Sequence, residues 1–308
     1  MSWTRSRFAN EMVPGLFAVS VDSYVNKRAE GMGMKLVTVK TSKKGYEEDA
    51  IRSGLGSAVE KAEGTPISYD TQIAGPKQRW VHKVFALGVR ITEESIDDNL
   101  YELKGGGEGN LKEIFYDLGE SLADNIEARL AVFLNSGTAT TYHTTRNGRA
   151  LFATDHPRLD GSTYQNYATN ADTTYLTFWS ILAAAENQYN QRQQRITKKV
   201  KAAWAPPQLE RAYREILYSP DRPDTGNRAV SALANSNRKI ALNIWPHMTD
   251  DDASFLQLDG RGIIFFWNRK TRFAREGDFQ TGDMMCKGDQ RWSAEIADEQ
   301  CFYGNIPA

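Results

Sequence analysis

The stretch NLKEIFYDLGESLADNIEARLAVFLNSG, residues 110–137, carries the strongest periodic pattern in the chain. Its large apolar residues recur at steps of three or four, which places them along one face of a helix with 3.6 residues per turn. Burying these side chains contributes roughly 10–20 kcal/mol as an upper bound, before the entropy of ordering is subtracted. The pattern therefore predicts a long amphipathic helix with a buried face formed by Leu111, Phe115, Leu118, Leu122, Ile126, Leu130 and Phe133.

Both ends of this helix carry recognisable signals. Asn110 can cap the free backbone donors while Glu113, three residues later, reaches back, and Gly137 suits a left-handed exit after the last turn. At 1.5 Å per residue the helix would be about 40 Å long, enough to cross a whole subunit. We therefore expect it to act as the backbone of the subunit.

Composition narrows the classes of protein. The 308 residues are enough for two compact cores. With 38 basic and 39 acidic residues, the chain has almost no net charge that would attract it to nucleic acid or to an anionic membrane. Any contact with DNA would be local. The longest apolar run, residues 263–267, is too short to span a bilayer, and the start MSWTRSRF lacks the apolar core of a signal peptide. We expect no membrane association and assembly in the cytosol where the chain is made.

A second informative region lies before the long helix. Ile67, Tyr69, Thr71 and Ile73 alternate with polar residues, Gly75 and Pro76 suit a turn, and alternation resumes over residues 81–91. This predicts a long two-stranded hairpin. Because an isolated hairpin is marginal in water, its outer half, residues 62–82, needs a partner surface, for which another subunit is the candidate.

The remaining chain gives weaker expectations. Residues 1–31 contain too little apolar surface for a core and are expected to form an arm, while residues 35–40 alternate as a strand and residues 41–57 read as an exposed connection. Thr249 is expected to cap a short helix through Leu256, with the three aspartates after it in the first turn. The end, residues 273–303, reads as a set of short strands.

No catalytic motif emerges. Phosphate loops, the dinucleotide fingerprint, GxSxG and HExxH are absent, and Cys286 and Cys301 form no CxxC pair, so we expect no cofactor and no metal site. His156, beside Asp155, could act as a base, but a structural loop histidine is the preferred interpretation. The basic residues Arg192, Arg195, Lys198, Lys199 and Lys201 are expected at a solvated helix end, with phosphate contact as the alternative.

Several segments, taken together, resemble a known family. NGRALFATDHP, residues 147–157, resembles the "G..LF.t.HP" segment that follows the spine helix in major capsid proteins of tailed bacteriophages. Residues 61–99 resemble the family's extended loop returning to the spine, residues 204–229 its strand, proline and helix, and residues 248–256 its later short helix. The four segments occur in the family's order, and the resemblance covers nearly the whole chain. The insertion GGGEGN before the spine helix is a departure from the family pattern.

The resemblance implies an α+β fold of the Hong Kong ninety-seven type. Its parts would be an N-terminal arm (1–31), a peripheral domain (32–60 and 83–137) with the spine helix (110–137), an extended loop (61–82), an axial domain (138–270), and return strands with a C-terminal tail (271–308). The implied assembly residues are Leu111, Phe115, Leu118, Leu122, Ile126 and Leu130 in the spine core and Glu63, Ile67, Tyr69, Ile73 and Trp80 in the loop.

The function implied is that of a non-enzymatic major capsid protein of the virion. It would self-assemble through hexamers and pentamers into an icosahedral shell enclosing double-stranded DNA, which it would contact weakly and without sequence specificity. Because an arm-like segment already lies within the first thirty residues, we expect no removable scaffold extension; a separate scaffolding protein and a portal protein are expected partners, with a cement protein as a further candidate. The alternatives are an encapsulin-like nanocompartment shell and, more remotely, an unrecognised hydrolase.

Overall fold

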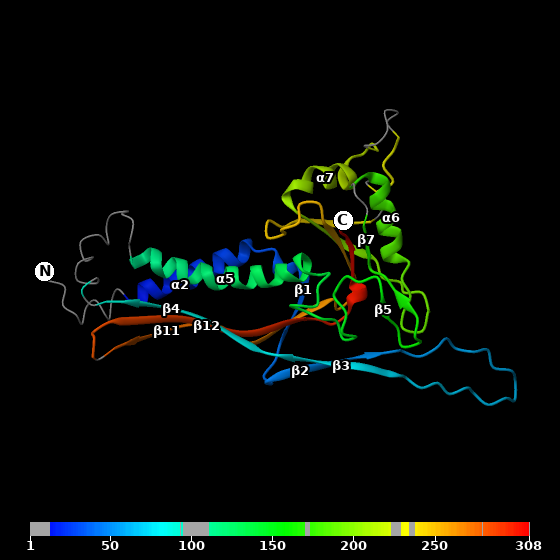
Figure 1. The fold of residues 1–308 in the computed structure, drawn as a ribbon, viewed down its shortest axis with the longest axis horizontal. Coiled ribbons are helices and arrows are strands. Elements are labelled where there is room, and N and C mark those ends of the chain that lie inside the picture. The colour runs from blue at the N-terminus through cyan, green and yellow to red at the C-terminus, as the bar shows by residue number, and fades with distance from the viewer. Residues whose placement is uncertain are drawn as a thin grey trace.

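The computed structural model describes residues 13–92, 94, 111–169, 173–222, 229–233, 238–278 and 280–307. The molecule is elongated (Figure 1): two helices lie over a long twisted sheet, a second lobe with two further helices stands at the other end, and a two-stranded hairpin projects away from both. Helices and strands are segregated and most strand pairs are antiparallel, which confirms the α+β class.

The long helix predicted over residues 110–137 is α5, Leu111–Asn135. Asn110, the side chain of Leu111 and the Gly-rich segment before them lie outside the described residues. The other predicted members of the apolar face are buried at 3% exposure or less: Phe115, Leu118, Leu122, Ile126, Leu130 and Phe133. The predicted left-handed exit at Gly137 is wrong, since its φ is not positive. Glycine stands there because a Cβ atom would lie 2.5 Å from the Phe152 ring.

Helix α2, Val13–Glu30, packs along α5, so this part of the expected arm is a helix on the body of the subunit. The contact is made by small and polar groups, which is why an apolar pattern did not reveal it. Ser20 Oγ donates to the carbonyl oxygen of Phe115 and Ser23 Oγ to that of Tyr116, each at 2.7 Å. Gly119 permits the close approach, since a Cβ atom there would lie 2.3 Å from the Ser20 carbonyl oxygen.

The sheet beneath α5 is built on two long antiparallel strands, β11 (Ile263–Gly277) and β12 (Met284–Ile296). β1 (Val37–Thr41) pairs in parallel with β11, and β4 (Lys83–Ile91) pairs antiparallel with β12. The expectation of several short strands near the C-terminus is therefore wrong. Helix α3, Gly33–Leu36, leads into β1.

The second lobe contains a five-stranded sheet in the order β7 (Tyr167–Ala168), β13 (Phe302–Asn305), β10 (Ser254–Leu258), β8 (Val200–Ala205) and β9 (Ala241–Ile244). Its own apolar core lies against the helices α6 (Tyr175–Glu186) and α7 (Glu210–Tyr218). The prediction of a short helix after Thr249 is wrong. Asp250 Oδ1 instead accepts hydrogen bonds from the backbone N–H groups of Asp252 and Ala253, which forms a turn. The chain then enters the fully buried strand β10, and its pairing with a strand on each side overrides the local helix signals. The elements of this part are β5 (His156–Pro157), β6 (Thr163–Tyr164), β7 (Tyr167–Ala168), α6 (Tyr175–Glu186), β8 (Val200–Ala205), η3 (Pro207–Leu209), α7 (Glu210–Tyr218), β9 (Ala241–Ile244), β10 (Ser254–Leu258), η4 (Glu299–Cys301) and β13 (Phe302–Asn305).

The projecting hairpin differs from its prediction. Its strands are β2 (Tyr46–Arg52) and β3 (Ala74–Val81), so the expected exposed connection contains a strand and the expected turn at Gly75 and Pro76 lies inside one. The register is irregular between Ala50 and Arg52, opposite these two residues, and such a bulge accommodates a proline that cannot donate to the ladder. A Cβ atom at Gly75 would lie 2.8 Å from the Leu159 side chain.

Within the described residues, no helix has both the length and the apolar character needed to cross a membrane.

Candidate assembly site

Residues 53–73, here called the projecting loop, connect β2 to β3 and reach farther from the body than any other described segment (Figure 1). At its root, the Ser53 N–H donates to the Ile73 carbonyl oxygen at 3.0 Å, and the Ile73 N–H donates to Ser53 Oγ at 2.9 Å. At its tip, the Thr65 N–H and hydroxyl both donate to the Ala62 carbonyl oxygen, with Gly64 at φ 77°. The loop is thus closed at both ends by hydrogen bonds.

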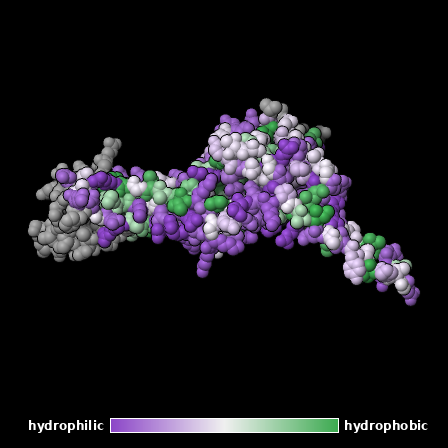
Figure 2. All heavy atoms as spheres, turned by 60° about the horizontal axis from the view of Figure 1, so that its bottom comes forward, coloured by the Kyte–Doolittle hydropathy of each residue, from purple (hydrophilic) through white to green (hydrophobic). Residues whose placement is uncertain are grey.

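The apolar side chains of the projecting loop are between 51% and 88% exposed, because no core forms beneath them. Figure 2 shows hydrophobic residues interspersed with hydrophilic ones along the narrow projection at the right. Several large exposed apolar side chains on one segment mark an interaction surface, unlike single scattered ones. These side chains are Leu55, Val59, Ile67, Tyr69 and Ile73.

The structure separates the five predicted loop residues into two groups. Glu63 lies at the tip turn, and Ile67, Tyr69 and Ile73 are exposed along the loop. Trp80 does not belong with them, because it is only 2% exposed and its ring lies 5.7 Å from that of Phe266 inside the subunit. Its placement in the loop was wrong: it is a buried residue of β3 that fixes the hairpin to the main sheet.

Arg192, a residue of the second lobe, forms hydrogen bonds with the projecting loop. Its Nη1 lies 2.6 Å from Asp70 Oδ2, its Nη2 donates to the Thr71 carbonyl oxygen at 2.6 Å, and its Nε donates to Ser53 Oγ at 3.3 Å. The backbone N–H of Gly56 lowers the pKa of the Asp70 carboxyl, and the Arg192 guanidinium adds to this effect. A single side chain therefore joins both arms of the loop to the second lobe.

The basic residues around Arg192 are not at a helix end as expected, since α6 ends at Glu186 and Arg192 lies in a turn beyond it. Gln194, in the same turn, donates from Nε2 to Ser57 Oγ at 2.9 Å. Sequence reasoning missed both anchors. A charged turn residue offers no periodic signal, and its partners lie far away in the chain.

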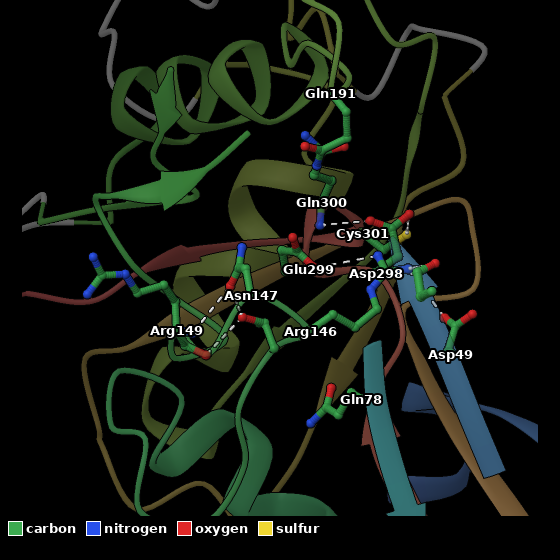
Figure 3. Close-up of polar contacts among 12 residues, drawn as sticks. Asp49, Gln78, Arg146, Asn147, Arg149, Gln191, Asp298, Glu299, Gln300 and Cys301 are labelled. Carbon is green, nitrogen blue, oxygen red and sulfur yellow. Dashed lines mark hydrogen bonds and ion pairs between the residues drawn. The ribbon is translucent and has the colours of Figure 1, made fainter. Parts of the chain in front are cut away.

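The base of the hairpin is fixed by a buried charge cluster around Arg146 (Figure 3). Arg146 Nη1 lies 3.3 Å from Asp49 Oδ2 on β2, and its Nη2 lies 3.8 Å from Oε2 of the buried Glu299. Tyr164 donates to Glu299 Oε1 at 2.9 Å, and burial raises the pKa of this phenol well above its ordinary value, which keeps it a donor. Gln78 on β3 donates to the Thr144 carbonyl oxygen. The angle of the hairpin is therefore set by polar contacts to the chain after α5 and to η4.

His156, the one candidate for a base, lies in the interior with no exposed surface. Its Nε2 lies 3.2 Å from Asn166 Oδ1, its ring stacks on Tyr164, and burial lowers its pKa below 6.5. Asp155 pairs instead with Arg149 at 2.8 Å. A ring enclosed in this way offers no face to a substrate, so its contacts are structural.

The two cysteines are also buried, and burial raises the pKa of each thiol to about 11. Among the described residues, no three His, Cys, Asp or Glu side chains gather closely enough to hold a metal ion.

Comparison with known proteins agrees with this geometry. Residues 78–297 match the model of a protein family described as phage capsid protein. A comparison with curated protein sequences finds no match. Among solved structures, the chain is similar to the capsid of the Cyanophage P-SCSP1u, at 13% identity over 90% of this chain and 88% of that chain, with a TM-score of 0.56.

Two further structures show the same fold. A chain of Microbacterium phage Oxtober96 is 11% identical over 90% of this chain and 91% of that chain, with a TM-score of 0.55. The SrpI encapsulin of Synechococcus elongatus PCC 7942 is 9% identical over 91% of this chain and 86% of that one, with a TM-score of 0.52. The fold is thus the Hong Kong ninety-seven-type capsid fold, and because the family match spans well over half of the sequence, the chain belongs to the phage capsid protein family.

Proposed function

We propose that this major capsid protein assembles through hexamers and pentamers into an icosahedral shell that encloses double-stranded phage DNA. The observation that supports the proposal most is the projecting loop, which is firmly attached at its root yet exposes five large apolar side chains with no core of their own. Surfaces of this kind are covered in an assembly by another chain. Contacts between unlike surfaces of identical subunits close into rings, which are the units of a shell.

The parts of the subunit take corresponding roles in this proposal. α2, α5 and the four-stranded sheet form the peripheral domain, and the projecting loop lies over a neighbour. The five-stranded sheet with α6 and α7 forms the axial domain around the ring axis. β11 begins at Ile263 and belongs to the four-stranded sheet, whereas β13 belongs to the five-stranded sheet. The expected boundary at residue 270 is therefore moved to residue 262, and the last strand, β13, is returned to the axial domain.

The proposed partners follow from charge and geometry. With 38 basic and 39 acidic residues, the chain would contact packaged DNA weakly and without sequence specificity. A separate scaffolding protein would control curvature, a portal protein would occupy one vertex, and a cement protein could cover the outside. Assembly would take place in the host cytoplasm, before the shell becomes part of the virion, and the protein's role is structural with no reaction.

The encapsulin shell is the second candidate, supported by the similarity to SrpI across 91% of this chain. The two functions differ in what the shell contains. Particles purified from phage-producing cells and treated with nuclease should retain protected double-stranded DNA. Particles that instead retain a stoichiometric second protein and no nucleic acid would favour the nanocompartment.

A further inference from the structure

A polar pocket of about 490 Å³ lies beside the hairpin, where β2 passes the second lobe. Its lining comes from separate elements, with Asp49 on β2, Gln191 in the turn after α6, and Asp298 just before η4 (Figure 3). The remaining lining includes residues 50–54, Arg146, Arg261 and Gln300. A ligand bound in this pocket would therefore contact the hairpin and the second lobe at the same time.

The carboxylates of this pocket are paired with cations of the same chain. Arg146 Nη1 lies 3.3 Å from Asp49 Oδ2, and Lys198 Nζ lies 2.6 Å from Asp298 Oδ2. The buried Glu299 is also close to Arg146, with 3.8 Å between Arg146 Nη2 and Glu299 Oε2. Each of these three carboxylates therefore already has a cation beside it.

Two further guanidinium groups line the pocket without a counter-ion. Arg52, at the end of β2, and Arg261, between β10 and β11, are exposed, and neither side chain forms an ion pair or hydrogen bond with any residue that the structure describes. Nε2 of Gln191 and the backbone N–H of Gly54 likewise meet no acceptor in the described part of the chain, whereas Gln191 Oε1 accepts from the Leu159 N–H at 3.1 Å. The pocket is thus left with an excess of positive charge and of hydrogen-bond donors.

An oxyanion of the phosphate class supplies what these groups lack. A guanidinium presents a planar fork of N–H donors that matches two oxygens of a phosphate, and such charge-assisted hydrogen bonds are roughly twice as strong as neutral ones. The oxygens of one anion can accept from both arginines and from the neutral donors at once. Because the lining comes from the hairpin, the turn after α6 and the chain around η4, the pocket suits a small free anion better than the backbone of stiff duplex DNA.

We propose that this pocket binds a free phosphate-class oxyanion shared by Arg52 and Arg261. Arg52 belongs to the hairpin, whereas Arg261 belongs to the segment that joins the two sheets, so the shared anion links the hairpin to the body of the subunit. The Gly54 N–H and Nε2 of Gln191 donate to its remaining oxygens. The anion adds a second anchor for the hairpin beside Arg192, and because it acts within a single subunit, this inference does not depend on the proposed shell function.

Isothermal titration calorimetry of the unassembled 308-residue subunit, in chloride buffer at constant ionic strength, tests the site with inorganic phosphate and diphosphate as probes. At least one of the two anions should bind saturably, once per chain. Arg52→Gln with Arg261→Gln should weaken this binding by about tenfold or more, because charge-assisted hydrogen bonds are lost at each position. Lys40→Gln with Lys270→Gln removes the same charge from exposed positions on β1 and β11 and should leave the affinity unchanged.

Amide hydrogen exchange supplies a second readout, because a bound anion should hold the hairpin. The better-binding anion should slow exchange over residues 46–54 in the unsubstituted chain and in the lysine control, and should have no effect in the double arginine variant. The single variants Arg52→Gln and Arg261→Gln give the same comparison if the double variant folds poorly, each with a smaller loss of affinity.

Three outcomes would overturn the inference while leaving the shell function intact. Equal affinity in the arginine and lysine double variants would show that these arginines do not form the site. Titration heats that never saturate would show that the pocket binds no free anion. A short DNA duplex that binds with the same arginine dependence, while neither free anion binds, would show that the ligand is nucleic acid.

Discussion

Arg192 and Asp70 form an ion pair across 122 positions of the chain, with Nη1 and Oδ2 2.6 Å apart. The pair connects a turn of the second lobe to the returning arm of the projecting loop, while the same guanidinium also contacts Thr71 and Ser53. Because few apolar contacts support the loop, its position relative to the body depends on this side chain together with the Gln194–Ser57 hydrogen bond from the same turn. The loop is thereby presented in one orientation before any neighbour binds.

Removal of the Arg192 side chain should release the loop without unfolding the subunit. Arg192→Ala should speed amide hydrogen exchange over residues 53–73 and reduce particle yield, while the thermal midpoint of unfolding stays near that of the unsubstituted chain. Arg195→Ala removes the same charge from the same turn and should change neither. The exchanged pair Arg192→Asp with Asp70→Arg should recover part of the yield; no recovery would show that the ion pair is incidental.

The packing of α2 on the spine helix depends on the absence of a side chain at Gly119. In a helix interior Gly→Ala normally stabilises by about 0.5–1 kcal/mol. Here the new methyl group would lie 2.3 Å from the Ser20 carbonyl oxygen, so Gly119→Ala should destabilise by about 1–3 kcal/mol in urea unfolding of the unassembled subunit. Gly45→Ala meets nothing within 4 Å and is the matched control. Stabilisation by Gly119→Ala would show that α2 does not pack there.

These contacts show what the sequence could and could not predict. The spine helix was predicted because Phe115 to Phe133 follow a strict period, and β1 because residues 35–40 alternate between apolar and polar side chains. β2 was missed because Glu47, Glu48 and Asp49 give no apolar alternation. It is a strand only because β3 pairs with it. Arg192, Arg146 and Gly119 act through Asp70, Asp49 and Ser20, which lie 97 or more positions away, and one sequence contains no record of such pairs.

His156 makes stability depend on pH. Burial holds its pKa below 6.5, so the folded subunit keeps the ring neutral while the unfolded chain takes up a proton as pH falls. The stability is fully present above pH 6.5 and is lost progressively as pH falls from there toward the folded pKa, by up to about 1.4 kcal/mol per pH unit.

His156→Asn should lower stability at pH 8 by about 1–3 kcal/mol, because the buried hydrogen bond between His156 and Asn166 Oδ1 is lost, while Asn166 Oδ1 keeps the Ala153 N–H as a partner. The variant should also show a shallower decline of stability between about pH 7 and 5, measured by urea unfolding at each pH. The exposed His247→Asn serves as the control and should keep the original slope. Parallel pH profiles for His156→Asn and the unsubstituted chain would contradict a buried neutral ring.

Removal of the projecting loop should separate folding from assembly. Since Ser53 and Ile73 are hydrogen-bonded to each other, residues 55–71 can be deleted and Gly54 joined to Gln72 as a two-residue hairpin turn. The subunit should unfold at nearly the same urea concentration and form no closed particles. A second variant, with residues 55–71 replaced by a Gly/Ser linker of equal length, should behave in the same way. Normal particles from either variant would show that the loop side chains are dispensable.

Electron microscopy of the 308-residue chain, expressed together with its scaffolding partner, tests the central claim most directly. The subunit should appear in closed icosahedral shells, with five subunits at each vertex and rings of six between vertices, and each projecting loop should lie over a neighbouring subunit. A protein that stays monomeric at high concentration, or that forms only open sheets and tubes when its scaffolding partner is supplied, would contradict the account.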